Sequence, residues 1–256
     1  MKKSQKYNTY HKSTSVQGSV IRKDNFTYIN VLEPLSKYLK STPIQSGSKK
    51  TVLDIGCGAG SLSFYAAEKG NIVYGIDVSP DAIKTCKESA KLLSLKKVFF
   101  KTMDFPKDAP SKQFDFIIFS EVLEHIKEEK VALNRVYSIL AKNGILLITV
   151  PSSNAPLYRL RLLGNFDKRV GHVRRYNQKE LVEKLEQHKF RILDKYKKEG
   201  ILRNLLFTND FFGKLVRVFN KFGFLAQIFT IVDNIMAKVF GESQILIIAK
   251  KNSLSS

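Results

Sequence analysis

The stretch Val52-Leu53-Asp54-Ile55-Gly56-Cys57-Gly58-Ala59-Gly60 decides how this chain is expected to fold. Its apolar part predicts a buried β-strand with an acidic residue near its end, and its glycines predict a tight turn into a helix. Glycine lacks a Cβ, so the backbone turns sharply there and a ligand approaches it closely. The N–H groups at the start of the helix then face that ligand. The third glycine of a dinucleotide motif is out of register and no phosphate-binding lysine follows, so a nucleoside is favoured over a pyrophosphate.

A second predicted strand, residues 71–77, ends in Asp77. Asp77 lies about twenty residues beyond the glycine turn, where a doubly wound fold places the acid that binds ribose hydroxyls. Ser79 then suits an N-cap and Pro80 the first position of the next helix. The two strands, the glycine turn and the helices therefore predict a nucleoside-binding α/β fold.

These motifs resemble those of the class I S-adenosylmethionine-dependent methyltransferases, over roughly residues 50–195 and a last strand at 244–250. Three further segments fit that family in order, at residues 101–105, 114–120 and 140–151. The resemblance implies a Rossmann-like sheet of seven mostly parallel strands with helices on both faces, an antiparallel last strand, and S-adenosylmethionine as the cofactor. It assigns cofactor binding to Asp54, Gly56, Gly58, Gly60, Asp77, Val78, Asp104, Phe105 and Ser120.

The order of elements along the chain agrees with that fold, because short apolar runs alternate with helical patterns. The methyltransferase domain is expected at residues 49–256, after an N-terminal tail and helix at 1–48. Residues 1–24 are expected to be irregular and mobile, and 42–48 to be a linker. The other predicted helices are 25–39 (interrupted at Pro34), 60–69, 80–93, 127–140 and 177–188, and the other predicted strands are 51–55, 97–101, 114–119, 144–150, 190–196 and 244–249.

Residues 201–241 are predicted to be a helical insertion of two or three amphipathic helices before the last strand. The segment holds eight of the eighteen phenylalanines, with basic residues among them. Two interpretations stay open: a lid over an apolar substrate pocket, and a lid that also lies on a membrane interface. Its longest uncharged run, 222–232, is too short to cross a bilayer, and no run of about eighteen apolar residues predicts a spanning helix.

The formal net charge is +20. Such a charge attracts anionic partners such as nucleic acid, an anionic lipid surface or acidic substrates, and the alternative is a lysine-rich solvated surface. Cys57 and Cys86 are far apart in the sequence and predict no disulfide framework, and residues 1–12 lack the apolar core of a secretory signal. A cytoplasmic protein is therefore expected, with peripheral attachment at the inner membrane face left open.

Four ionisable side chains are candidates for the chemistry. Glu121, Glu124 and His125 follow the fourth strand, and a helix there would place all three on one face, because residues three and four apart are neighbours. Strand ends host ligands in this fold, so the reacting group is expected nearby. The pattern resembles that of quinone-biosynthesis O-methyltransferases and of small-RNA 2'-O-methyltransferases. In the latter a further histidine follows, and His172 stands where it is expected.

This resemblance implies a divalent ion such as Mg²⁺, held by Glu121, Glu124, His125 and His172, that orients and acidifies substrate hydroxyls. Without a metal, His125 or His172 acts as general base, since a neutral imidazole suits proton removal from a hydroxyl. In a third interpretation the histidines are structural and the acids favour a helix start. Arg174 and Arg175 are expected to bind an anionic substrate group or to face solvent.

The favoured function is in-line methyl transfer to oxygen of a lipophilic or lipid-linked small molecule. The alternative is a metal-dependent RNA 2'-O-methyltransferase, although no RNA-binding module is present and an apolar insertion suits a wet phosphate groove poorly. No DNA partner is predicted. A non-catalytic scaffold is disfavoured, because the glycine turn, Asp77 and Asp104 are all intact.

Overall fold

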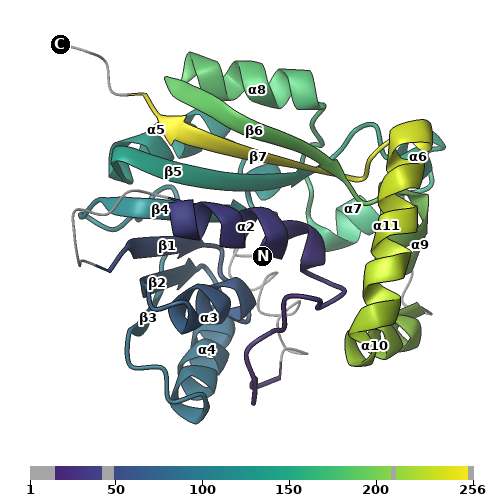
Figure 1. Cartoon of the computed structure of the whole chain (residues 1–256). Coiled ribbons are helices and arrows are strands. Elements are labelled where there is room, and N and C mark those ends of the chain that lie inside the picture. The colour runs from purple at the N-terminus through teal and green to yellow at the C-terminus, as the bar shows by residue number, and fades with distance from the viewer. Residues whose placement is uncertain (1–14, 42–48, 209–211, 253–256) are drawn as a thin grey trace.

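Seven strands form one sheet in the order β3-β2-β1-β4-β5-β7-β6. The structure is a computed structural model, of which residues 15–41, 49–208 and 212–252 are described. Only β7 runs antiparallel to its neighbours, so the mostly parallel sheet and its antiparallel last strand are confirmed (Figure 1). The strands are β1 Thr51–Ile55, β2 Ile72–Asp77, β3 Val98–Thr102, β4 Phe114–Ser120, β5 Leu140–Pro151, β6 Phe190–Lys198 and β7 Gln244–Lys251.

The helices lie within a few residues of their predicted bounds, with two differences. Helix α2 runs through Pro34 without the predicted interruption, and residues 154–176, for which no helix was predicted, contain α6 and α7. The expected linker at 42–48 and the first part of the tail, 1–14, lie outside the described residues. The helices are α2 Ile29–Ser41, α3 Ser61–Glu68, α4 Pro80–Leu92, α5 Glu129–Ile139, α6 Pro156–Arg159, α7 Gly164–Val170, α8 Gln178–Gln187, α9 Ile201–Thr208, α10 Gly213–Lys221 and α11 Gly223–Phe240.

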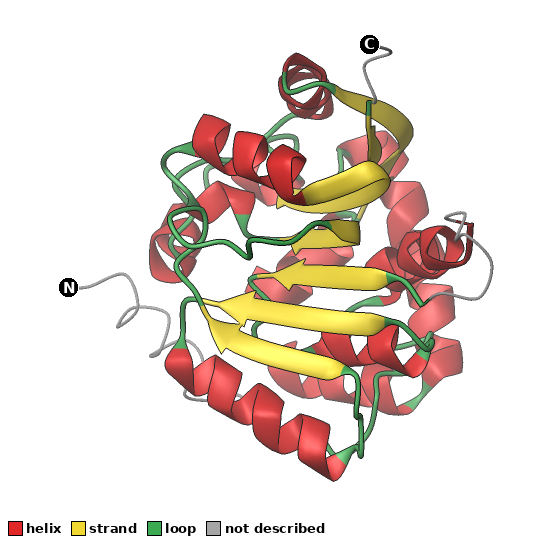
Figure 2. Ribbon diagram, turned by 90° about the vertical axis from the view of Figure 1, so that its left-hand side faces the viewer, coloured by secondary structure: helices red, strands yellow, loops and turns green. Residues whose placement is uncertain are grey.

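The sheet is apolar on both faces, as its continuous hydrophobic strands require. In β4, Phe116 and Ile118 point to one side, where α2, α3 and α4 pack. Ile117 and Phe119 point to the other side, where α5 and α8 pack. Figure 2 shows the helical layers on the two sides of the strands. The two-sided core fixes the strands, and so the position of every loop at their carboxyl ends.

The insertion consists of three helices, α9, α10 and α11, packed together beside the sheet (Figure 1). Helix α11 has eighteen residues with a mean hydropathy of 1.3, and 28% of it is buried. By length and composition alone, α11 is long and apolar enough to cross a membrane. This corrects the expectation, drawn from the run 222–232, that no helix of the chain is. That expectation counted uncharged residues only, whereas the helix continues through Asp233 and Lys238.

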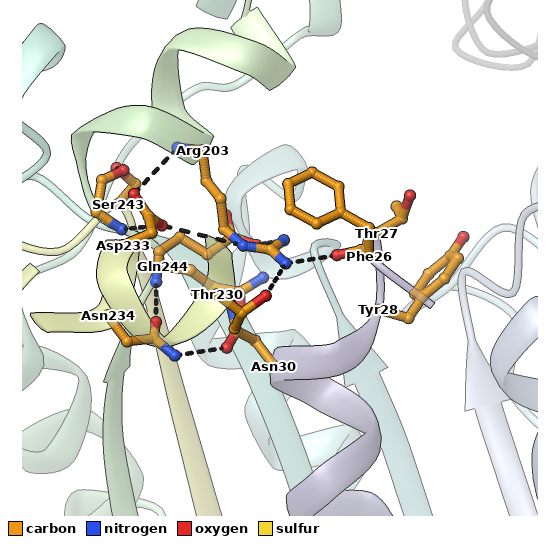
Figure 3. A network of polar contacts seen from close by, with 12 residues as sticks. Phe26, Thr27, Tyr28, Asn30, Arg203, Thr230, Asp233, Asn234, Ser243 and Gln244 are labelled. Carbon is orange, nitrogen blue, oxygen red and sulfur yellow. Dashed lines mark hydrogen bonds and ion pairs between the residues drawn. The ribbon is translucent and has the colours of Figure 1, made fainter. Parts of the chain in front are cut away.

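Arg203 joins this insertion to the N-terminal segment. Its side chain is fully buried and donates to the Phe26 carbonyl oxygen at 2.6 Å and to Thr230 Oγ1 at 2.9 Å (Figure 3). Its guanidinium lies 4.0 Å from the Phe26 ring centroid and 3.9 Å from Asp233 Oδ2. An unpaired buried charge is strongly destabilising. The N-terminal segment, α9 and α11 therefore form one packed unit.

Candidate functional site

The glycine turn lies at the carboxyl end of β1 and is tied to β2. Gly56 and Cys57 donate their N–H groups to the Ile76 carbonyl oxygen at 2.8 and 3.0 Å, and Gly58 N–H donates to Asp77 Oδ2 at 2.9 Å. Gly56 has φ +70°, a region that side chains disfavour, and a Cβ there would lie 2.4 Å from Val122 Cγ2. The turn therefore needs glycine for its conformation and for its close approach to the loop after β4.

Asp77 stands where the acid for the ribose was expected. The side chain is buried, and Oδ1 accepts the Ser79 N–H at 2.8 Å, while Oδ2 accepts from the glycine turn. A carboxylate has about four lone-pair positions, so two stay free for hydroxyl donors. Val78 follows it directly and is half-buried. Asp77 thus orders the turn and keeps acceptor capacity for a ligand.

The other predicted cofactor residues lie at the same edge of the sheet, because parallel strands end together. Asp104 follows β3 and is partly exposed, and Phe105 packs edge-on against Phe119 with ring centroids 5.7 Å apart. Ser120 Oγ lies 2.8 Å from Thr149 Oγ1. The structure therefore gathers residues of β1, β2, β4 and the loop after β3 around one region.

Asp54 faces inward rather than along this edge. It accepts a hydrogen bond from Ser63 Oγ at 2.6 Å, which fixes β1 to α3. Burial raises the pKa of Asp54 to about 7, although the Ser63 hydrogen bond opposes the rise. Its visible contribution is therefore to the shape of the glycine turn.

Two contacts to the turn were not expected from the sequence. Gln17 Nε2 donates to the Ala59 carbonyl oxygen at 2.8 Å, so the N-terminal segment lies against the turn. The Cys86 thiol donates to the Gly58 carbonyl oxygen at 3.1 Å from α4. Both residues come from elements remote in the sequence, so no local pattern indicated them.

Three of the four candidate catalytic and metal residues converge. Glu124 Oε1 lies 3.8 Å from His125 Nε2 and 3.8 Å from His172 Nε2, and one ligand atom of each residue falls within 4.8 Å of the others. The expected helix is wrong: Glu121 has φ +54°, and a single 3₁₀ turn, Leu123–His125, follows it. Glu121 Oε1 instead accepts from Gln244 Nε2 at 3.1 Å.

Each histidine is oriented through its Nδ1 atom. His125 Nδ1 lies 3.1 Å from the Gly171 carbonyl oxygen, and His172 Nδ1 lies 2.9 Å from Asp167 Oδ1. Because both partners are acceptors, we assign the proton to Nδ1, which leaves each Nε2 as an acceptor facing Glu124. The arrangement suits a general base or a metal ligand.

Asp167, which the sequence analysis missed, is held by Arg175. The guanidinium donates from Nε to Oδ2 at 2.9 Å and from Nη2 to Oδ1 at 2.6 Å. Burial acts to raise the pKa of Asp167, but the hydrogen bonds from His172 and Arg175 bring it below the ordinary value. Asp167 is therefore a stable anion beside His172.

Glu124 is the unusual member of the cluster. Its side chain is fully buried, and neither carboxyl oxygen has a hydrogen-bond partner among the described residues. Burial, and then the charge of Glu121, raise the pKa of Glu124. A buried carboxyl of this kind requires a proton or a cation.

The two arginines after His172 are paired with acids of the protein, so neither simply faces solvent. Arg175 is 4% exposed and paired with Asp167. Arg174 Nη1 lies 2.9 Å from Glu129 Oε2, and its Nη2 donates to the Lys127 carbonyl oxygen. They position the loop around His172.

The sequence of this chain is similar to those of known methyltransferases. A family model described as a methyltransferase domain matches residues 46–206. The ubiquinone biosynthesis O-methyltransferase of Glaesserella parasuis serovar 5 (strain SH0165) is 32% identical over 145 residues, which cover 55% of this chain and 61% of that protein. The phosphoethanolamine N-methyltransferase 3 of Arabidopsis thaliana is 33% identical over 129 residues, which cover 49% of this chain and 26% of that protein. The matches thus span less than two thirds of these relatives.

Solved structures share the fold. The magnesium protoporphyrin IX methyltransferase of Synechocystis PCC 6803 with bound SAH has a TM-score of 0.61 at 15% identity, covering 97% of this chain and 94% of that chain. A [4+2]-cyclase has a TM-score of 0.59 at 20% identity, covering 87% of this chain and 81% of that chain. One fold thus serves different reactions, and these likenesses show the architecture alone.

Proposed function

Because the chain belongs to the class I S-adenosylmethionine-dependent methyltransferases, we propose that it methylates an oxygen atom of a lipophilic or lipid-linked small molecule. The observation that carries the choice of oxygen is the His172–Asp167 pair. The Nε2 atom of His172 lies 3.8 Å from Glu124 Oε1, in the loop that follows β4. A weakly acidic hydroxyl is a poor nucleophile until its proton is removed, whereas a neutral amine attacks through its lone pair and releases a proton afterwards. The quinone-type relative supports a lipophilic acceptor.

The chain's residues divide into binding and proton-removing groups. S-adenosylmethionine supplies, when bound, a methyl group already activated by its sulfonium. As the family pattern implies, Asp77 accepts hydrogen bonds from the ribose hydroxyls and Asp104 contacts the adenine amino group. The glycine turn lets the cofactor approach the backbone closely. The insertion helices exclude water beside the acceptor. Holding the acceptor in line with the methyl group supplies several kcal/mol of the barrier.

His172 is the better of the two candidate bases. Its Nε2 takes the hydroxyl proton, and the imidazolium that results is stabilised by the Asp167 carboxylate on Nδ1. His125 Nδ1 lies 3.1 Å from the Gly171 carbonyl oxygen, a neutral acceptor, whereas His172 Nδ1 contacts the Asp167 carboxylate. We therefore assign proton removal to His172 and a supporting place beside Glu124 to His125.

A divalent ion at this cluster is the second candidate, favoured by the two Glu124 oxygens that lack hydrogen bonds. Glu124, His125 and His172 offer one carboxylate and two imidazoles within 4.8 Å. Imidazole suits zinc, iron or nickel, whereas Mg²⁺ prefers an all-oxygen shell, so the donor set fits a transition ion better than Mg²⁺. When bound, such an ion would act as a Lewis acid on the acceptor hydroxyl.

The test is transfer of label from methyl-labelled S-adenosylmethionine to a host-cell extract, separated into organic-soluble, RNA and protein fractions. We expect organic-soluble label that falls about 100-fold or more in His172→Gln and stays unchanged in the control His188→Gln, a histidine at the end of α8. Cofactor binding by calorimetry should survive in both variants. Label in RNA would refute the acceptor, and indifference to chelators would refute the ion.

The RNA 2'-O-methyltransferase alternative gains no support from the relatives described above. The compartment that we propose is the cytoplasm, because Cys57 and Cys86 are free and buried in the structure. Free thiols are the ordinary state of cysteine in a reducing compartment. Oxidation-sensitive activity in purified protein, restored by a reductant, is the expected companion observation.

A further inference from the structure

We propose that the outer face of α10 and α11, together with the neighbouring segment around α6, docks on an anionic membrane surface. We call this the docking face and define it by the exposed apolar stripe of α11 and by the basic residues Arg159, Arg161, Arg217, Lys221 and Lys238. In Figure 1, α10 and α11 stand beside the sheet at the edge of the molecule. The proposal does not depend on the methyl acceptor.

The apolar part of the docking face includes a stripe along α11. Phe224, Ile228, Ile231, Ile235 and Val239 are 46% to 72% exposed. Their spacing of four, three, four and four residues puts them on one side of the helix. The opposite stripe, Ala226, Thr230, Asp233 and Ala237, is buried against the protein. Helix α11 thus shows large apolar side chains outward and small or polar ones inward, the reverse of a water-exposed helix.

The exposed charges that α10 and α11 themselves carry have one sign, and the nearby acid Asp24, which lies against Gly223, is paired with Arg22. Asp233 is the only acidic residue of α10 and α11, and it is fully buried. Among the side chains of these helices that the structure describes, the exposed charges belong to Arg217, Lys221 and Lys238. Basic residues beside an apolar stripe are the composition of helices that lie in the interface of anionic lipids, where each contributes about 1 kcal/mol. The charge therefore selects an anionic lipid surface among the possible occupants.

The segment around α6 extends the face. Leu160 and Leu162 are 64% and 65% exposed, and Arg159 Nη1 donates to the Phe240 carbonyl oxygen at the end of α11 at 3.2 Å. A hollow of about 400 Å³ beside it is lined partly by Arg159 and Arg161. A lipid phosphate group is anionic and accepts hydrogen bonds, so it complements the arginine donors that line this hollow.

Helix α11 lies along the membrane rather than across it. Asp233 accepts the backbone N–H groups of Gly200 at 2.7 Å and Leu202 at 3.0 Å, and it balances the buried Arg203. Removing α11 to cross a bilayer would take Asp233 and Thr230 away from the buried Arg203 and leave Glu199, 3.6 Å from its Nη1, as the remaining acid. Losing part of the compensation of a buried charge is costly. The inner stripe therefore stays on the protein while the outer stripe enters the lipid interface.

Docking would also bring the proposed methyl-transfer site near the membrane, an inference that rests on the proposed function. The same chain segment that carries Leu160 and Leu162 continues through α7 to His172. A lipophilic acceptor concentrated in the bilayer would then reach the site from the docked side. The membrane supplies the acceptor and the protein supplies the base.

The test is flotation of the full chain, without cofactor or acceptor, with phosphatidylcholine vesicles that contain or lack phosphatidylglycerol. We expect binding to the anionic vesicles that weakens with salt. The variant Phe224→Ser/Ile231→Ser should bind about tenfold more weakly or worse, because two apolar side chains no longer enter the lipid. Lys221→Glu/Lys238→Glu should lose at least about fivefold per residue.

Matched controls change equally exposed residues elsewhere. Leu92→Ser/Val131→Ser alters apolar residues of α4 and α5, and Lys87→Glu/Lys130→Glu alters lysines of the same helices. Both should bind like the parent. Cofactor binding by calorimetry reports that each variant is folded, so a failed docking test is distinguishable from a failed methyl-transfer proposal.

Three results would overturn the proposal. In the first, the parent chain ignores anionic vesicles, or the docking-face variants bind as well as the controls. In the second, light scattering shows a dimer that only Phe224→Ser/Ile231→Ser dissociates, so a second copy covers the face. In the third, the chain ignores vesicles but binds RNA through Lys221 and Lys238.

Discussion

Substitution of Gly56 by alanine is the sharpest test of how the glycine turn is built. Gly56 has φ +70°, and an added Cβ would meet Val122 Cγ2 at 2.4 Å. A left-handed conformation costs alanine about 1–2 kcal/mol, and overpacking costs about 1–3 kcal/mol. Gly56→Ala should therefore lower the free energy of unfolding by about 2–5 kcal/mol, measured by urea denaturation.

The variant Val122→Ala separates the two costs. It removes both Val122 methyl groups, so the double variant should recover the overpacking part and keep the backbone part. The double-mutant cycle should then show a favourable coupling of about 1–3 kcal/mol. Costs that add to within about 0.5 kcal/mol would refute the steric account, because independent sites behave that way.

Three further predictions follow from the same contacts. Asp77→Asn should weaken S-adenosylmethionine binding about 10- to 100-fold in calorimetry, since a charged acceptor is lost, and unchanged affinity would contradict the ribose assignment. Asp167→Asn should slow label transfer about 100-fold, because the amide no longer holds the proton on His172 Nδ1. The control Asp194→Asn, which alters an acid that contacts Lys37, should leave the rate unchanged. Burial raises the pKa of Glu199 to about 7, so the folded chain keeps a proton that the unfolded chain releases near pH 4 to 5. Stability from this group should thus fall as pH rises from about 4.5 to 7, by at most about 3 kcal/mol, and Glu199→Gln should flatten the curve in denaturation measured across that range.

The sheet and the cofactor edge were predictable because their signals are local. Buried parallel strands read as continuous apolar runs, as in β4 and β5, and the glycine turn depends on residues adjacent in sequence. Asp77 lies at the end of its own strand, so its position followed from counting residues. Helix ends were equally local, as Ser79 shows by accepting the Ala82 N–H.

The acid–histidine cluster was predicted only in part, because long-range contacts shape it. Glu121 adopts positive φ where its N–H donates to Thr149 of the neighbouring strand, a contact that no local pattern encodes. Asp167 meets His172 only through the bend that closes α7. Likewise, the uncharged run 222–232 did not show how long α11 is, because the helix continues past Asp233, whose carboxylate accepts backbone N–H groups at the start of α9.

The Arg203 junction has a consequence for the order in which the chain is synthesised. Phe26 is buried against residues of α9, α10 and α11, and Arg203, which covers its ring, lies 177 residues downstream. Proteins emerge from the ribosome amino-terminus first, so the Phe26 ring has no packing site until residues 201–240 have been translated. Messages truncated before residue 201 would therefore release chains that lack every packing partner of Phe26 in α9, α10 and α11.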